Sequence, residues 1–319
     1  MDASALLALA SGPTILLAVM NSGSVFAGVT WSSTVVHLYN WARAADALLQ
    51  LLWLAWLLGR RLSASGRSTR HRAVMIASLA VLGAPVMAGP VLQLPGITFT
   101  AGLLLRTVLL AWLACEICLR HNIPLSRPVT SSERLLRRHT AFRQTSMVAS
   151  YCLLGAGATS VAVFTLRWLG PGWLPVMRTD QASALGATSR ADLLVALPWT
   201  VVLEGVTIGT VSLLLHTAGR STVQIYTIIA VPEIIFHAYF GLPAVLMAVY
   251  AVLCCHFYLR YHRLGPLLLG HALYDLLGML AGPWPVVYRI PLGAVIGIAW
   301  LAAERWVAAP PRSRTAPVL

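Results

Sequence analysis

The sequence contains no lysine and few acidic residues, so charged side chains make up only 10% of its 319 residues. Soluble domains carry roughly 25% charged residues, and this scarcity therefore excludes an ordinary soluble protein. Apolar residues take their place, because 58% of the chain is hydrophobic and its mean hydropathy is +0.76. The composition predicts a polytopic membrane protein.

Cysteine is scarce as well, and its placement argues against a zinc-binding module. The 5 cysteines all lie in apolar segments. Cys115 and Cys118 have the spacing of a CxxC motif, but no second pair accompanies them to complete a tetrahedral zinc site. We interpret the cysteines as small buried apolar residues.

Apolar stretches along the chain each approach the ~20 residues that a helix needs to cross a bilayer. Lipid cannot satisfy backbone hydrogen-bonding groups, so such long stretches are predicted to be helices. The chain is therefore expected to be all-α, a polytopic transmembrane helical bundle of about ten spans, of which the first is not a cleaved signal peptide. The predicted spans cover about 4–24, 36–59, 73–94, 98–118, 145–168, 193–216, 222–240, 242–261, 265–282 and 287–306.

All 23 basic side chains are arginine, and most of them lie in alternate loops. By the positive-inside rule these loops face the cytoplasm, and both termini of the chain are then cytoplasmic. Short arginine-rich loops bind the anionic phospholipid headgroups of the cell inner (plasma) membrane, an explanation that we prefer to nucleic-acid binding. Arginine in place of lysine, together with many alanines, indicates a GC-rich bacterial genome.

The chain divides near residue 190. Residues 1–190 are predicted to hold N-terminal transmembrane helices with basic cytoplasmic loops. The segment 191–306 contains the ionisable residues that can take part in catalysis. Residues 307–319 are predicted to form a cytoplasmic tail.

Arginines also occur inside two apolar stretches of the N-terminal part. Asp46 stands three residues after Arg43, within reach along a helix, so we expect a structural ion pair between them. Arg106 has no acidic residue within such reach and is expected to contact another helix.

Four ionisable residues lie in the most apolar stretches of the C-terminal part: Glu204, His237, His271 and Asp275. A charge or an imidazole at bilayer depth is expensive and by default marks a functional site. His271 and Asp275 are four residues apart and share one face of a helix, where the carboxylate can accept a hydrogen bond from the imidazole. Together these groups can activate water and polarise a carbonyl. The alternative is that each makes a purely structural interhelical hydrogen bond.

Two prolines precede these residues within the same stretches. Pro198 lies before Glu204 and Pro232 before His237, and a proline inside a helix removes a backbone hydrogen bond. Broken helices at membrane depth are tolerated where they line a cavity, so we expect an interruption beside the site. His237 and His271 fall toward opposite faces of the membrane, and an interruption or a tilt is needed to bring them together.

These residues resemble the three motifs of the CAAX-protease and bacteriocin-processing (CPBP, also called Abi) intramembrane proteases. The motifs of that family are EExxxR, FxxxH and HxxxN or HxxxD, each on its own helix. The chain has EGVTIG from Glu204, EIIFH ending at His237 and HALYD from His271. The stretch YLRYHRLGP, just before the last of these, is also similar to the family. The resemblance covers about residues 193–282.

The resemblance implies a metal-independent intramembrane endopeptidase without a cofactor, acting on a prenylated or precursor peptide. Glu204 and His237 are then expected to activate water, while His271 and Asp275 stabilise the oxyanion. Residues 191–306 become the catalytic helical core. A zinc site built from the histidines and the glutamate is the minority alternative, because the sequence lacks an HExxH motif.

The chain departs from the family in its first two motifs. Gly205 and Gly209 stand in place of a glutamate and an arginine, and we expect them to widen the substrate cavity. Glu233 replaces the phenylalanine and is expected to face this cavity as a second carboxylate, while Phe236 packs beside the motif histidine. Two alternatives therefore stay open. One is acid–base chemistry other than hydrolysis, such as cyclisation or isomerisation of an isoprenoid or lipid. The other is a non-catalytic immunity or scaffold protein that binds a partner within the membrane.

Overall fold

The computed structural model describes residues 1–64, 74–75, 77–81, 83, 97–126, 137–178 and 190–281. These residues form helices, joined by turns and by two isolated β-bridges. In chain order the elements are α1 (Asp2–Ala27), α2 (Ser33–Ala64), α4 (Ile97–Arg120), α5 (Arg137–Leu169), α7 (Arg190–Glu204), η1 (Gly205–Val211), α8 (Ser212–Thr217), α9 (Thr222–Phe236), η2 (Ala238–Phe240), η3 (Leu242–Leu246), α10 (Met247–Tyr261) and α11 (Leu264–Ala281). The element η1 is a π-helix, whereas η2 and η3 are 3₁₀-helices.

Within the described residues, five helices are long and apolar enough to cross a membrane: Asp2–Ala27, Ser33–Arg61, Thr140–Leu169, Asp192–Thr217 and Leu242–Tyr261. Two shorter apolar helices, Thr222–Phe236 and Leu264–Met279, accompany them. The chain is thus an α-helical membrane protein, as its composition predicts, although the described part supports five spans and not ten. The predicted span 73–94 is described at only a few positions, and the predicted span 287–306 and tail 307–319 lie outside the described residues.

The two prolines that were expected to interrupt their helices do not do so. Pro198 lies inside α7 and Pro232 lies inside α9, and both helices continue past them. The irregular backbone lies instead after Glu204, where the π-helix begins, and at His237, where α9 ends. Neighbouring groups can satisfy the carbonyl that a proline leaves without its usual donor, so a proline alone does not predict a break in a membrane helix.

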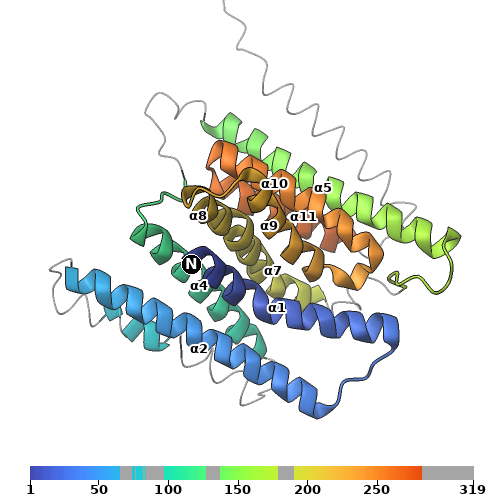
Figure 1. Cartoon of the computed structure of the whole chain (residues 1–319), viewed down its shortest axis with the longest axis horizontal. Helices are drawn as coiled ribbons and strands as arrows, with labels where there is room; N and C mark the ends of the chain where they lie inside the picture. Colours follow the sequence, from blue (N-terminus) through green and yellow to red (C-terminus); the bar gives the residue numbers. More distant parts are fainter. Residues whose placement is uncertain are drawn as a thin grey trace, which may run out of the picture.

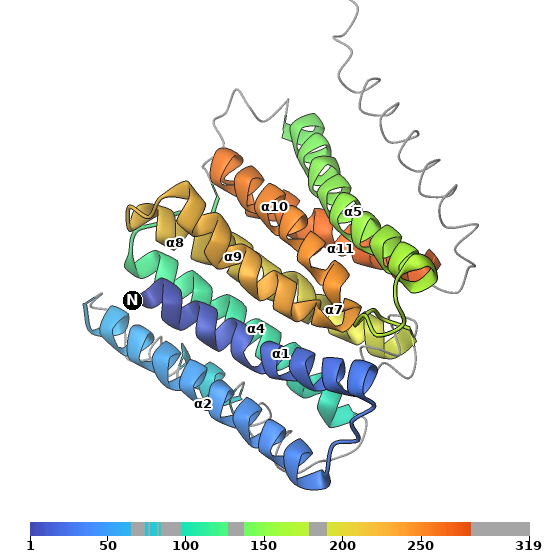
Figure 2. The same cartoon turned by 45° about the vertical axis from the view of Figure 1, so that its right-hand side comes forward.

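The helices lie side by side around a central rod formed by α7, η1 and α8 (Figures 1 and 2). α1 and α4 pack on one side of this rod, and α10 and α11 pack on the other. α2 covers one edge of the bundle, where it contacts α1 and α4, and α5 covers the opposite edge, where it contacts α10 and α11. Side chains on the rod therefore meet partners from both parts of the chain.

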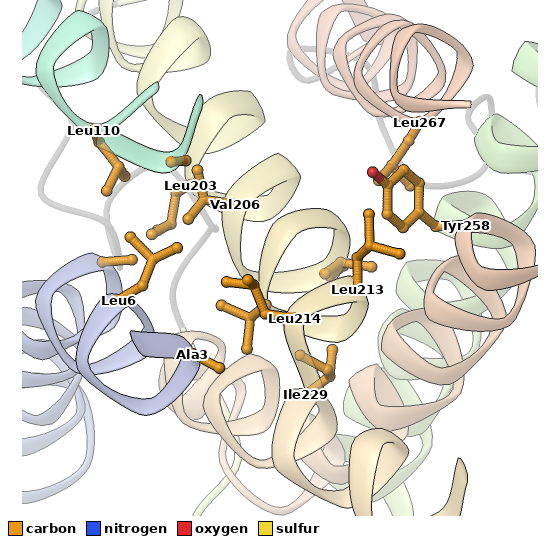
Figure 3. Close-up of a cluster of buried hydrophobic side chains, with 14 of the residues drawn as sticks. Ala3, Leu6, Leu110, Leu203, Val206, Leu213, Leu214, Ile229, Tyr258 and Leu267 are labelled. Atoms are coloured by element: carbon orange, nitrogen blue, oxygen red, sulfur yellow. The ribbon is translucent and has the colours of Figure 1, made fainter. Parts of the chain in front are cut away.

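The larger of two hydrophobic cores follows the rod along its length (Figure 3). Leu203 of α7 lies among buried side chains that include Leu6 of α1 and Leu110 of α4. Further along the rod, Leu213 of α8 lies toward Tyr258 of α10. Because lipid is as apolar as leucine, these contacts stabilise the bundle through close packing and not through the exclusion of water.

Two glycines let α5 approach its neighbours closely. Gly155 of α5 lies against Tyr250 of α10, where a β-carbon would collide with the Cβ and backbone of the tyrosine. Gly270 of α11 lies against α5, where a β-carbon would come within 2.6 Å of the Val148 Cβ. Small residues at such contacts are typical of helix pairs in membranes. The part of α5 between Val148 and Gly155 is thereby held directly against α10 and α11.

A tight loop at the end of α9 depends on Gly241. Its φ of 79° and ψ of −141° lie near a backbone region that is essentially restricted to glycine. A β-carbon there would overlap the carbonyl of Pro175, which accepts a hydrogen bond from the Leu242 N–H at 3.0 Å. The loop packs Tyr239 into the second, smaller core. It therefore fixes the end of α9, where His237 lies.

Replacing Gly241 with alanine is expected to destabilise the fold by about 3 kcal/mol, because both the backbone conformation and the available space exclude a β-carbon. Gly219→Ala is the matched control. Gly219 also has a positive φ, of 73°, but no atom lies within 4 Å of the added β-carbon. A loss of about 1 kcal/mol is expected there. Thermal unfolding in detergent measures both variants, and equal losses would contradict the close contact with Pro175.

Basic residues from several helices gather at one end of the bundle, which we call the arginine-rich end. Arg120 at the end of α4 pairs with Asp2 at the start of α1, at 3.4 Å, and lies 4.8 Å from the ring centre of Trp56 on α2. An isolated bridge joins Ser126 to Arg263 in the turn between α10 and α11. Among the described residues, the ends of α2 and α4 and the turn between α10 and α11, which the arginine pattern assigns to one side of the membrane, therefore lie at one end of the structure.

A buried ion pair joins α2 to α4. Arg106 donates a hydrogen bond to Asp46, as expected for an arginine that contacts another helix. Its guanidinium also lies 4.6 Å from the ring centre of Trp199 on α7. Arg43, the partner that the sequence spacing predicts for Asp46, lies 5.6 Å from the ring centre of Tyr39. The pair and the ring of Trp199 thus connect α2, α4 and α7 in the buried interior of the bundle.

Candidate functional site

A group of polar side chains lies inside the bundle where α5, α7, α9, α10 and α11 meet. Four of the residues that the sequence indicated belong to it: Glu204, Glu233, His271 and Asp275. Glu204 and His271 are only 8% and 7% exposed, so the helices that carry these side chains also enclose them. We call the whole group the polar cluster: Cys152, Glu204, Glu233, Tyr250, His271 and Asp275.

His271 and Asp275 form the contact that their spacing on one helix predicts. The Nε2 atom of His271 lies 3.0 Å from the Oδ2 atom of Asp275, one turn further along α11. The hydroxyl of Thr200, on α7, lies 3.2 Å from the same carboxylate oxygen and 3.0 Å from the backbone carbonyl of Leu197, and it can donate its proton to either acceptor. The carboxylate therefore orients the imidazole, and α7 in turn holds the carboxylate.

The other ring nitrogen of His271 faces three groups. Its Nδ1 atom lies 2.7 Å from Glu204 Oε2, 2.8 Å from the Tyr250 hydroxyl and 3.9 Å from the Cys152 sulfur. The Glu204 contact is close but does not have the alignment of a hydrogen bond. When Nε2 carries the proton that it donates to Asp275, Nδ1 can accept from the tyrosine hydroxyl. One nitrogen exchanges one proton at a time, so these groups are alternative proton partners of His271.

Glu204 occupies a distinctive place in the rod. It is the last residue of α7, and the seven-residue π-helix η1 begins directly after it. π-helical turns are rare and occur frequently at functional sites. The motifs in the sequence predict His237 as the partner of this glutamate, whereas the structure places Glu204 against His271.

Glu233 is fully buried on α9, and neither of its carboxyl oxygens has a hydrogen-bond partner. Glu204, His271 and Thr207 are among the groups around it. The Thr207 hydroxyl does not donate a hydrogen bond to Glu233, however, because it donates to the carbonyl of Leu203 at 3.0 Å. A buried carboxylate without partners is far more expensive than a protonated carboxyl, so we expect Glu233 to carry a proton and to act as a hydrogen-bond donor.

His237 lies at the edge of the polar cluster and meets it through Glu233. Its Nδ1 donates to the backbone carbonyl of Glu233 at 2.8 Å and lies 4.0 Å from that residue's carboxyl. Because a carbonyl only accepts, Nδ1 carries the proton and Nε2 is the nitrogen that can accept one. The ring lies parallel to that of Phe240, with centres 6.2 Å apart. His237 is thus positioned by the loop after α9 and not by the helix that carries Glu204.

The expectation that Gly205 and Gly209 widen a cavity is wrong. A β-carbon on Gly205 would overlap Leu268, and one on Gly209 would come within 3.2 Å of Leu264. Leucines of α11 therefore fill the space that the glycines leave. The two glycines act as a close contact between the rod and α11, which brings Glu204 within reach of His271. Phe236 is buried in the larger hydrophobic core.

In the part of the chain that the structure describes, no group of three or more His, Cys, Asp or Glu side chains is arranged to hold a metal ion. Three residues of the site or its support are not predicted from the sequence: Cys152, Thr200 and Tyr250. They are ordinary residues of apolar helices, so no local signal distinguishes them. Only the packing of α5 and α7 against α10 and α11 brings them to the site.

Comparisons with protein-family models, with curated proteins and with solved structures find no match to this chain. The function is therefore inferred from the polar cluster and its membrane setting.

Proposed function

We propose that this protein is a membrane-embedded hydrolase whose polar cluster cleaves an acyl bond in a substrate held within the bilayer. The observation that carries this proposal is the line Glu204–His271–Asp275, in which one buried imidazole lies between two carboxyl groups. Ionisable groups at membrane depth mark functional sites by default. A general base or acid placed within hydrogen-bonding reach typically contributes 10²- to 10⁴-fold to a rate.

Each residue of this line has a proposed role. Glu204 takes a proton from the attacking water, and His271 delivers a proton to the leaving group. Asp275 holds Nε2 of the imidazole and stabilises the imidazolium that forms when Nδ1 gains a proton. The Tyr250 hydroxyl lies at the same nitrogen and can donate to the substrate oxygen as negative charge develops on it. These steps use only side chains of this chain.

His237 is assigned to proton transfer at the edge of the site. Its Nε2 can accept a proton, and its side chain is partly exposed, whereas Glu204, Glu233 and His271 are buried. Glu233 lies between this imidazole and the line that carries the reaction. Nε2 of His237, and not the Nδ1 that faces Glu233, can therefore accept protons released during turnover.

The resemblance to the CPBP intramembrane proteases supports a prenylated or precursor peptide as the substrate. We place the protein in the inner (plasma) membrane of a bacterium, with both termini and the arginine-rich end toward the cytoplasm and its anionic headgroups. In this orientation the termini and the basic loops lie on one side, and the polar cluster lies within the apolar part of the bundle.

Glu233 favours a second candidate function. A protonated carboxyl group without partners, enclosed among apolar helices, can deliver a proton to a carbon–carbon double bond. That step begins an acid–base cyclisation or isomerisation of an isoprenoid or lipid. The two candidates differ in their products, because hydrolysis adds water to the substrate whereas isomerisation conserves its mass.

Replacing Glu204 with glutamine is expected to lower hydrolysis about 10³-fold, because the amide cannot take the proton from water. The full-length protein is reconstituted in liposomes with a farnesylated peptide, and products are identified by mass spectrometry. Glu116→Gln is the matched control, since Glu116 pairs with Arg61, outside the polar cluster. Full activity in the Glu204→Gln variant would contradict the proposal. A product of unchanged mass from an isoprenoid substrate would favour the second candidate.

A further inference from the structure

A cysteine on α5 lies against the catalytic imidazole, although α5 contributes nothing to the motifs recognised in the sequence. The Sγ atom of Cys152 is 3.9 Å from Nδ1 of His271, and the cysteine is 2% exposed. This separation is within the range of a weak thiol–imidazole hydrogen bond. The thiol therefore faces the same nitrogen as Glu204 does.

The position of Cys152 is determined by close helix packing on both sides of it. Gly155, three residues later, admits the backbone of Tyr250 on α10. Val148, four residues earlier, occupies the space left by Gly270, the residue before His271 on α11. Both contacts leave no room for a β-carbon, so α5 cannot slide or turn at this point without a collision. The sulfur and the imidazole are thus held together by the backbone contacts around them.

Cys152, His271 and Asp275 occur in the order of nucleophile, base and orienting acid. In that arrangement a base takes the proton of the nucleophile through one ring nitrogen, while a carboxylate holds the other nitrogen. Here Nδ1 faces the thiol and Nε2 contacts Asp275 at 3.0 Å. We propose that Cys152 is a catalytic nucleophile that forms a thioester with the acyl group of the substrate. This inference rests on the proposed hydrolase function and adds a covalent intermediate to it.

The chemistry then runs in two balanced halves. In the first, His271 takes the thiol proton, the sulfur attacks the substrate carbonyl, and the bond to the leaving nitrogen or oxygen breaks as that atom receives the proton. In the second, Glu204 takes a proton from water, the water attacks the thioester, and the carbon–sulfur bond breaks. The thiolate regains a proton from Glu204 through the imidazole, and an acid is released. Glu204 and Cys152 can share one ring nitrogen because they use it in different halves.

Glu233 supplies a second observation that indicates a ligand at this place. It is fully buried, both of its carboxyl oxygens lack a hydrogen-bond partner, and it belongs to the same polar cluster as His271 and Cys152. Buried polar atoms are normally paired, so an unpaired carboxyl beside a nucleophile is available to a bound group. Together with the Tyr250 hydroxyl, it can donate to the oxygen of the tetrahedral intermediate.

Other buried cysteines provide controls of matched burial. Cys254 lies within hydrogen-bonding reach of Cys152, and Cys255 faces Ser212. Both are fully buried on α10, as Cys152 is nearly so on α5. Cys255→Ser therefore removes a thiol of the same burial without touching the imidazole. The measurements are made with a reducing agent present, which keeps Cys152 and Cys254 as thiols.

The test treats the purified full-length protein with p-nitrophenyl octanoate and follows the octanoyl adduct by intact mass and peptide mapping. We expect one adduct, on Cys152, that neutral hydroxylamine removes as it does a thioester. The adduct should be absent in Cys152→Ser, unchanged in Cys255→Ser, and formed at least tenfold more slowly in His271→Ala. Glu204→Gln should accumulate it at least tenfold, because hydrolysis of the thioester needs the activated water. N-ethylmaleimide should also label Cys152 at least tenfold faster than Cys255, in a manner that requires His271.

Two outcomes separate this inference from the hydrolase function itself. If Cys152→Ser hydrolyses substrate at the wild-type rate while Glu204→Gln does not, water attacks directly, the hydrolase stands and the nucleophile is overturned. In the second outcome, Cys152 forms its adduct while Glu204→Gln changes neither the hydrolysis of that adduct nor peptide cleavage. That result would support Cys152 as the nucleophile and contradict the role of Glu204. Equal labelling of Cys152 and Cys255 by both reagents would also overturn the nucleophile. The melting temperature of each variant identifies any that fail to fold, and Cys152→Ala then replaces Cys152→Ser.

Discussion

Replacing His271 with alanine is expected to lower hydrolysis by about 10⁴-fold, the largest effect of any single substitution in the polar cluster. The imidazole contacts both carboxyl groups of the catalytic line and also the Tyr250 hydroxyl. Its loss removes the proton carrier and leaves Glu204 and Asp275 without their shared partner. Steady-state cleavage of the peptide in liposomes measures the effect, and thermal unfolding shows whether the variant is folded.

The matched control for this change is His256→Ala. His256 is an exposed histidine on α10 whose Nδ1 lies 2.9 Å from the Tyr226 hydroxyl, away from the polar cluster. Its loss is expected to change the cleavage rate less than twofold. A folded His271→Ala variant that keeps more than a tenth of the wild-type rate would place the chemistry elsewhere in the molecule.

Replacing Asp46 with leucine is expected to destabilise the protein by about 4 kcal/mol, because it leaves the Arg106 guanidinium buried without its partner. Both members of the pair are enclosed, and Gln50 Nε2 donates to the same Asp46 oxygen at 2.9 Å. The double variant Asp46→Leu/Arg106→Met is expected to recover most of this loss, since apolar residues can replace a buried pair at little cost. Unfolding in detergent, followed by tryptophan fluorescence, measures all three proteins.

The surface pair Arg120–Asp2 is the control for this experiment. It is partly exposed at the arginine-rich end, and Arg120→Gln should cost less than about 1 kcal/mol. If the double variant were as unstable as Asp46→Leu alone, apolar packing could not replace the pair. The ion pair would then have a role beyond holding α2 to α4. That role would involve the polar cluster, because Arg106 contacts Trp199 and the next residue, Thr200, contacts Asp275.

The sequence predicts the contact between His271 and Asp275 because both residues lie on one helix, one turn apart, where the geometry is local. It does not predict the contact between Glu204 and His271. That contact depends on the rotation of α7 relative to α11, and motif order alone favours His237. Cys152 is harder still to foresee, since it stands 119 positions from the histidine that it faces. Only the packing of α5 brings the two together.

The effect of glycines and prolines on the structure is likewise not predicted by the local sequence. The helices run through Pro198 and Pro232, where local chemistry predicts interruptions. Leucines of α11 fill the space beside Gly205 and Gly209, although the absence of two side chains predicts a cavity there. The sequence shows that a glycine lacks a side chain or that a proline lacks an N–H group. Only the fold shows which neighbouring groups fill that space or satisfy the unpaired carbonyl. The membrane class, by contrast, follows from composition, which needs no tertiary information.

The π-helix in the central rod has a consequence for the direction in which its two ends face. An α-helix advances by ~100° for each residue, and a π-helix advances by less because its turns are wider. Over the seven residues of η1, the rotational offset between α7 and α8 therefore departs from that of a continuous α-helix. The rod behaves as two helices that share an axis but differ in azimuth. As a result, α7 can present Glu204 to α11 while α8 presents its leucines to the hydrophobic core.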